Sequence, residues 1–127
     1  LAPGELVVAV TLPESERARR SRYVKVAERA ALDFALASAA VAIELDGEVL
    51  RSVRIALGGV GTRPWRALES EHELAGQRPT PERLQRAAAA AVATARASAQ
   101  RAFKIELAQR VLIRALQEAL PAEGKAS

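Results

Sequence analysis

Lys25 is the residue whose surroundings most invite chemistry, because it lies in an apolar run, between Val24 and Val26, where a free ammonium group needs a partner. Arg22 and Arg29 flank it along the chain. Three cations placed in this way suit an acceptor-rich group, such as a ring carbonyl, a ring nitrogen or a pyrophosphate. Strand alternation alone would instead place Lys25 on a solvent-exposed sheet face. The residues by themselves leave both interpretations open.

The glycine-rich segment 58–61 (GGVG) follows a strand-like run and precedes a helix-like one, which is where a phosphate-binding loop would lie. Its spacing does not suit that chemistry. A dinucleotide fingerprint requires a third glycine where Pro64 stands, and a P-loop requires Gly-Lys followed by Ser or Thr. The glycines therefore predict a tight turn and close packing of the backbone.

Catalytic and metal-binding groups are scarce in this sequence. It contains no Cys and one His, which excludes a thiolate metal site and a Cys nucleophile. His72 has no second ligand at i+4, so we expect a surface histidine. The carboxylates that could serve acid–base catalysis lie in no motif that fixes their geometry: Glu14, Glu16, Glu28 and Asp33. We expect no catalytic residue and no metal site within this chain.

The composition predicts one compact domain, since 127 residues at 50% apolar content can bury a single core. The net charge of +4 raises the question of nucleic-acid binding. Apart from a basic cluster at 17–22, however, the cations alternate with acidic residues, and only four aromatic residues could stack on bases. We therefore expect no nucleic-acid partner.

Targeting signals are also missing from this sequence. No apolar run approaches the roughly 18 residues of a membrane span, and no signal peptide is recognisable. Together with the absence of Cys, this favours a cytoplasmic location. The sequence has no Met and begins inside an alternating apolar segment, so we expect part of a longer polypeptide.

Four segments carry strand signals. Residues 5–12 alternate between apolar side chains and are bounded by Pro3-Gly4 and Pro13. A second strand is expected at 23–26, and residues 30–35 suggest a helical turn. Strands at 39–45 and 49–57 form a hairpin around Asp46-Gly47.

The register of this hairpin is constrained by its apolar positions. If residues 46–48 all lie in the loop, the pairs Leu45–Val49, Val41–Val53 and Ala39–Ile55 keep one apolar face continuous. A β-bulge would shift this parity.

After Pro64 the apolar residues recur at intervals typical of helices. Helices are expected at 64–74, at 81–95 with Thr80 as N-cap and Pro81 at the first position, and at 99–120, followed by a frayed tail at 121–127. The fold class is α+β, with an antiparallel sheet of three or more strands followed by three helices packed on one face. The predicted core comprises Val41, Ile43, Val53, Ile55, Phe103, Leu107 and Val111.

Several ordered segments resemble one known family. They are PGEL at 3–6, LP at 12–13, RYVKV at 22–26, FA at 34–35, LDG at 45–47, IALGGV at 55–60, PWRA at 64–67 and AFKIELA at 102–108. Together they resemble the C-terminal domain of the FAD-binding subunit of molybdenum hydroxylases, the family of xanthine dehydrogenases, aldehyde oxidoreductases and carbon monoxide dehydrogenases. The resemblance covers nearly the whole chain.

This resemblance implies a role in a larger oxidoreductase. The family's subunit has an N-terminal FAD-binding region of the vanillyl-alcohol-oxidase type. Its partners are a molybdopterin subunit and a [2Fe–2S] subunit, from which FAD passes electrons to NAD or another acceptor. Residues 1–13 would then be the last strand of the flavin domain, and 14–120 the C-terminal domain.

The same resemblance implies three cofactor-binding residues. The flavin-facing lysine of the family's strand would be Lys25, with Arg29 and Asp33 near the flavin edge. The pyrophosphate loops would lie before Leu1, so FAD should not bind tightly to this chain alone.

Two other functions remain open at this point. A protein-interaction module would be marked by an exposed apolar stripe on the helices. A nucleic-acid binder would require the 17–22 cluster to gather with Lys25, Arg51 and Arg54 on one surface.

Overall fold

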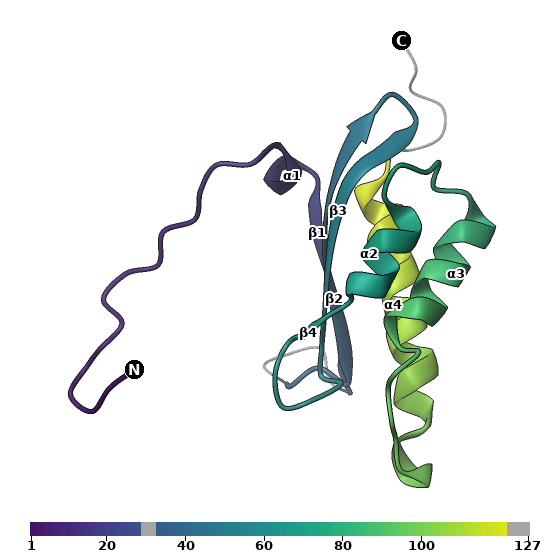
Figure 1. Ribbon diagram of the computed structural model, residues 1–127. Helices are drawn as coiled ribbons and strands as arrows, with labels where there is room; N and C mark the ends of the chain where they lie inside the picture. The colour runs from purple at the N-terminus through teal and green to yellow at the C-terminus, as the bar shows by residue number, and fades with distance from the viewer. Residues whose placement is uncertain (29–32, 122–127) are drawn as a thin grey trace.

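The computed structural model describes residues 1–28 and 33–121 (Figure 1). Its elements are α1 (Glu16–Arg19), β1 (Ser21–Val26), β2 (Ala37–Asp46), β3 (Val49–Gly58), β4 (Trp65–Arg66), α2 (Leu68–Leu74), α3 (Pro81–Ala91), a 3-10 turn η1 (Ala99–Arg101) and α4 (Phe103–Ala119). The strands form one antiparallel sheet in the order β1-β2-β3-β4. Helices α2, α3 and α4 lie on one side of it, which confirms the predicted α+β class.

The core forms where the odd-numbered face of the hairpin meets the helices. Strand alternation buries Val41, Ile43, Val53 and Ile55, as predicted. Helix α4 packs on β1 and β2, α2 packs on β3, and α3 packs against both helices. The buried stripe of α4 repeats every three or four residues and contains Ala108, Val111, Leu112, Ala115, Leu116 and Ala119.

The hairpin forms, but its predicted register is wrong. Ala39 pairs with Leu57, Val41 with Ile55 and Ile43 with Val53. Only Gly47 and Glu48 form the turn, because Gly47 adopts φ +57. A β-bulge beside Glu44 and Leu45 then adds Arg51 to β3 and restores the apolar face.

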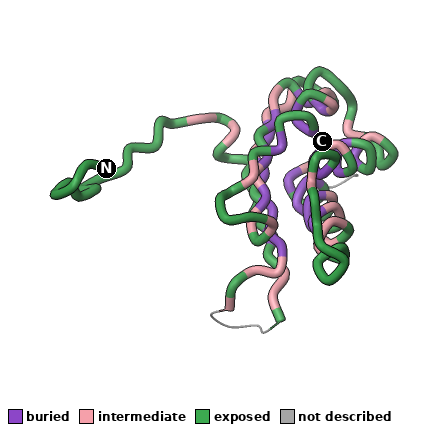
Figure 2. The backbone as a smooth tube through the Cα atoms, turned by 60° about the horizontal axis from the view of Figure 1, so that its bottom comes forward, coloured by how far each residue is buried: buried purple, intermediate pink, exposed green. Residues whose placement is uncertain are grey.

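The predicted strand at 5–12 is absent from the sheet. These residues are exposed along an extended segment that leaves the domain, with Leu6 85% and Val8 95% exposed (Figures 1 and 2). A strand needs hydrogen-bonding neighbours, and none of the four described strands pairs with this segment.

Two predicted helix boundaries also need correction. Trp65 and Arg66 pair with β3 as β4, so the helix expected from Pro64 begins at Leu68. Thr80 caps α3 as predicted, but the helix ends at Ala91 rather than near Ala95. Of the helical turn expected at 30–35, residues 30–32 lie outside the described residues, and 33–35 are not helical. The tail from 122 onward also lies outside them.

Phe103 was wrongly assigned to the core. It is 53% exposed, because helical spacing places it opposite the stripe that contains Val111 and Leu112. Leu107 lies at the flank of that stripe and is half-buried. The prediction followed steps of four residues, which drift around the helix by about 40° each, so that of Phe103, Leu107 and Val111 only Val111 reaches the buried face.

Phe103→Ala is therefore expected to change the free energy of unfolding by less than about 0.5 kcal/mol, as for an exposed position. Val111→Ala, on the buried stripe, should cost about 2 kcal/mol through lost burial and a small cavity. Urea denaturation of both variants and the wild type measures the two losses. A larger loss for Phe103→Ala than for Val111→Ala would contradict this arrangement.

Candidate functional site

The face of the sheet away from the helices is open, and it carries Lys25. Three rows of paired residues cross this face. One row runs Ser21, Ala42, Arg54; the next runs Tyr23, Ala40, Ala56, Arg66; and the third runs Lys25, Ser38, Gly58. The middle of the face is therefore floored by alanines, with longer side chains at its edges.

These small residues leave a shallow hollow between Tyr23 on one side and Arg54 and Arg66 on the other. Ala40 and Ala56 lie on its floor. Both arginines and the ring of Tyr23, which is 63% exposed, are accessible from solvent. A flat or smooth surface could approach this backbone closely, with cations at one rim.

The structure places two of the three predicted cofactor residues together. Lys25 is exposed, and its Nζ donates to the carbonyl oxygen of Asp33 at 2.9 Å. The Asp33 carboxylate accepts the backbone N–H of Phe34 at 2.8 Å. It therefore bonds to the backbone of the segment that leads into β2 and not to the ammonium group of Lys25. Arg29 lies outside the described residues. An ammonium with one of three protons used can still donate to a ligand.

Glu71, on α2, organises the arginine rim. Its carboxylate accepts Arg66 Nη2 at 2.8 Å, a second bond from Arg66 Nε, and Arg54 Nη1 at 3.3 Å. It also accepts the backbone N–H of Ile55 at 2.8 Å. Glu71 is only 4% exposed, whereas both arginine side chains are about half exposed. One buried carboxylate thus fixes two cations of the open face.

The electrostatics of this cluster follow from its contacts. Burial alone would raise the pKa of Glu71, but the bonds from Arg66 and Ile55 and the charges of Arg66 and Arg54 outweigh it, so its pKa is lowered. The hydrogen bond to Glu71 raises the pKa of Arg66. Glu71 stays ionised at neutral pH and keeps both guanidinium groups in place.

Sequence reasoning missed Glu71, although its spacing contains a signal. Ala67, Glu71 and Leu74 follow one another at helical intervals of four and three, so they share the buried side of α2. A carboxylate on that side needs a cationic partner, and Arg66 is the nearest in sequence.

The glycine-rich segment serves packing, as predicted. Gly59 adopts φ +72, and a Cβ there would lie 2.6 Å from the carbonyl oxygen of Ala35 and 3.0 Å from that of Leu36. Its own carbonyl accepts Lys104 Nζ at 3.0 Å. The end of β3, the connection into β2 and the start of α4 therefore meet at one residue.

Three of the arginines that a nucleic-acid surface would require are engaged by groups of the domain itself. Arg51 pairs with Glu44, Arg54 pairs with Glu71, and Arg17 Nη1 donates to Ser52. These arginines are held by their own domain.

Within residues 1–28 and 33–121, no group of His and acidic side chains could hold a metal ion. No helix in this part of the chain combines the length and apolarity of a membrane span.

The proposed apolar stripe of an interaction module is likewise missing from the described helices. Their exposed large apolar side chains are Leu68 and Phe103, on different helices. His72 is exposed, as expected.

Known proteins resemble this chain in sequence and in fold. The CO dehydrogenase flavoprotein C-terminal domain matches residues 22–119. The aldehyde oxidoreductase FAD-binding subunit PaoB of Escherichia coli (strain K12) is 41% identical over 120 residues, which cover 94% of this chain and 34% of that protein. The glyceraldehyde dehydrogenase medium chain of Sulfolobus acidocaldarius is 40% identical over 59% of this chain and 26% of that protein. The chain thus spans about a third or less of these curated relatives.

Solved structures show the same arrangement of elements. A carbon monoxide dehydrogenase from Hydrogenophaga pseudoflava that lacks the Mo-pyranopterin moiety of its cofactor superposes with a TM-score of 0.71 and 33% identity, covering 78% of this chain and 36% of that chain. Quinoline 2-oxidoreductase from Pseudomonas putida 86 superposes with a TM-score of 0.71 and 27% identity, and the match covers 79% of this chain and 36% of that chain. The fold and the matched residues show that this chain belongs to the CO dehydrogenase flavoprotein C-terminal domain family.

Proposed function

We propose that this chain is the C-terminal domain of the FAD-binding subunit of a molybdenum hydroxylase, and that its open sheet face covers the flavin. The observation that carries the proposal is the position of Lys25 on the face that the helices leave free. The relative from E. coli is an FAD-binding subunit by name, which supports the choice of cofactor.

The residues present suit the ring end of FAD. The alanine floor permits close approach of a flat ring, and Lys25 supplies a cation with N–H groups to spare. Segment 58–61 does not suit the pyrophosphate, because Gly59 is already packed against the backbone of Ala35 and Leu36. The phosphates would therefore be held by the preceding FAD-binding region.

When bound, FAD supplies the redox chemistry that connects a molybdopterin centre and iron–sulfur clusters to NAD or another acceptor. This domain contributes position and charge. Lys25 holds a positive charge near the ring edge and favours the form of the ring with more negative charge. Asp33 fixes the lysine through its carbonyl oxygen. Arg29, which lies outside the described residues, stays part of the proposal on the family resemblance alone. The partners are the molybdopterin and [2Fe–2S] subunits of the parent enzyme.

Lys25→Ala in the full-length subunit tests this role. Removing the cation should lower the two-electron reduction potential of the flavin by about 30 mV, equivalent to about 1.4 kcal/mol, and slow turnover of the parent's substrate. Spectroelectrochemistry measures the potential. Folding should be unaffected, since Lys25 is exposed.

Arg114→Ala is the matched control, because it removes one exposed positive charge from α4, on the other side of the sheet. It should leave the potential at its wild-type value. If Lys25→Ala also leaves the potential and turnover unchanged, Lys25 is an ordinary solvated lysine and the proposed contact is wrong.

Residues 5–12 belong to the same proposal. Their alternating apolar side chains are exposed and no described strand pairs with them. We infer that residues 1–13 complete the sheet of the preceding flavin domain as its last strand, which would satisfy their backbone hydrogen bonds. The C-terminal domain proper would then cover residues 14–120.

A further inference from the structure

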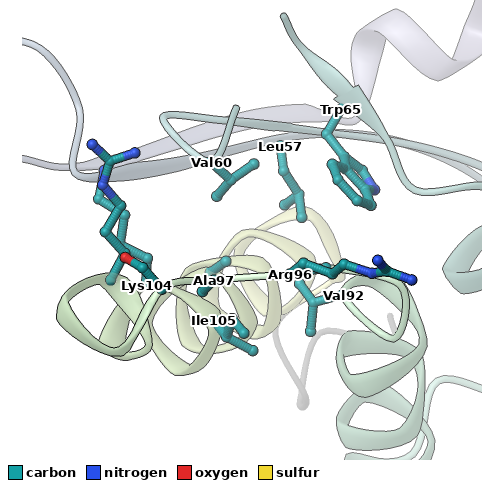
Figure 3. A pocket seen from close by; sticks show the side chains of 12 residues that line it. Leu57, Val60, Trp65, Val92, Arg96, Ala97, Lys104 and Ile105 are labelled. Atoms are coloured by element: carbon teal, nitrogen blue, oxygen red, sulfur yellow. The ribbon is translucent and has the colours of Figure 1, made fainter. Parts of the chain in front are cut away.

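A second cavity lies on the helical side of the sheet, away from the proposed flavin face. It has a volume of about 210 Å³ and is bounded by the end of β3, the connection after α3 and the first turns of α4. Figure 3 shows Leu57, Val60 and Trp65 on one side, facing Val92 and Ile105 on the other. The opposed side chains form an apolar slot with one aromatic wall.

The charges around this slot are all of one sign. Arg96, Arg101 and Lys104 line it, and no acidic residue does. The ion pairs found among the described residues use other arginines. In Figure 3 the side chain of Arg96 extends below Trp65 at one end of the slot, and Lys104 lies at the other end. The slot thus combines apolar walls with a positive potential that its lining leaves unbalanced.

The cations are not equally available. Lys104 already donates to the carbonyl oxygen of Gly59 at 3.0 Å, so part of its donor capacity is used. Arg96 is exposed, and its side chain extends to the end of the slot at which Trp65 lies. A planar guanidinium binds a carboxylate through two parallel hydrogen bonds. A phosphate is better matched by several convergent donors, such as the backbone N–H groups at a helix start, whereas Arg96 and Lys104 lie at opposite ends.

We propose that this cavity binds a small aromatic carboxylate, with its ring in the slot against Trp65 and its carboxylate on Arg96. The volume lies below the roughly 300 Å³ at which pockets for drug-sized ligands begin, which restricts the ligand to about one ring. Offset packing of the ring on Trp65 supplies contact area, and the guanidinium fixes the orientation. This site is separate from the flavin face and does not depend on the proposed function.

The single Trp of the chain makes the test direct. Benzoate is titrated into the ¹⁵N-labelled 127-residue chain while the one indole N–H signal, from Trp65, is followed by NMR. A saturable shift with a dissociation constant of about 1 mM or below is expected. Benzamide, which keeps the ring without the charge, and acetate, which keeps the charge without the ring, should each bind at least about tenfold more weakly.

Variants identify the partner of the carboxylate. Arg96→Gln should weaken benzoate binding by about fivefold, in keeping with one charge-assisted contact at a partly exposed site. Arg114→Gln is the control. It also removes one positive charge, but from a position on α4 outside the cavity, and it should leave the dissociation constant within about 1.5-fold of wild type. Both substitutions are at exposed positions, and urea denaturation checks that the fold is kept.

Four results would overturn the proposal. They are no saturable shift of Trp65 with benzoate, benzamide binding as strongly as benzoate, unchanged affinity in Arg96→Gln, and inorganic phosphate shifting Trp65 as strongly as benzoate. The last result would indicate a general anion site without aromatic selectivity.

Discussion

Replacing Gly59 with alanine is expected to lower the free energy of unfolding by about 3 kcal/mol, from backbone strain and overpacking together. Gly59 has φ +72, which costs a residue with a Cβ about 1–2 kcal/mol. In addition, the new Cβ would lie 2.6 Å from the carbonyl oxygen of Ala35. Because the atoms it meets are backbone, no side chain can rotate away to relieve the contact. Urea denaturation of the variant and the wild type measures the loss.

Gly47→Ala separates the two contributions. Gly47 also has positive φ, at +57, but nothing lies within 4 Å of a Cβ built there. It should therefore lose only the conformational part, about 1 kcal/mol. Equal losses at Gly47 and Gly59 would show that the close approach of Gly59 to Ala35 and Leu36 contributes nothing.

The elements with a strong local period could be predicted from the sequence. Alternation in the hairpin predicted Val41, Ile43, Val53 and Ile55 in the core, and Thr80 before Pro81 predicted the start of α3. The trace of the bulge in the sequence is slight. Leu50 and Val53 are both buried but lie three residues apart, and Arg51 is the residue added between them. Because Val49 also offers an apolar side chain, the alternation alone allows more than one register.

Errors arose where tertiary contacts override local preference. Pro64 favours a helix start, yet Trp65 and Arg66 gain hydrogen bonds by pairing with β3, and α2 begins after them. Residues 5–12 have the pattern of a strand, but the pattern cannot form one without neighbouring strands. In both cases the outcome depends on whether another strand pairs with the segment, which the pattern of the segment itself does not decide.

The candidate site was predictable only in part. Lys25 was singled out by its apolar neighbours, and its position on the open face agrees with simple alternation. The arginine rim was not anticipated, because it depends on a helix meeting the edge of β3. Arg54 and Glu71 are 17 residues apart in sequence, and only the fold brings them to 3.3 Å.

The last prediction concerns this cluster. Glu71→Gln is expected to lower the free energy of unfolding at pH 7 by about 3 kcal/mol, the lower end of the range for breaking a buried ion pair. The value stays at the lower end because Arg54 and Arg66 are about half exposed and partly screened by solvent. The glutamine amide keeps the volume of the side chain but loses its charge. Its NH₂ group is a hydrogen-bond donor, so on that side it cannot accept the N–H groups of Arg54 and Arg66.

An exposed pair provides the control. Glu106 accepts Arg110 Nη2 at 2.6 Å on the surface of α4, a distance as short as those around Glu71. Glu106→Gln should nevertheless cost no more than about 0.5 kcal/mol, since exposed i,i+4 pairs contribute little. Comparable losses for the two variants would mean that burial of Glu71 has no energetic consequence.

The pH dependence distinguishes a lost charge from a packing defect. The folded state lowers the pKa of Glu71 below its unfolded value of about 4.3, so the unfolded chain binds the proton more tightly. The stabilisation by the carboxylate is therefore complete above about pH 5 and is lost as the pH falls through the lower, folded pKa. Urea denaturation of wild type and Glu71→Gln between pH 7 and pH 3 should show a stability difference that is constant at first and shrinks below about pH 4. A difference that is the same at pH 3 as at pH 7 would assign the loss to packing, and the ionised Glu71 would not be what holds Arg54 and Arg66 at the rim of the open face.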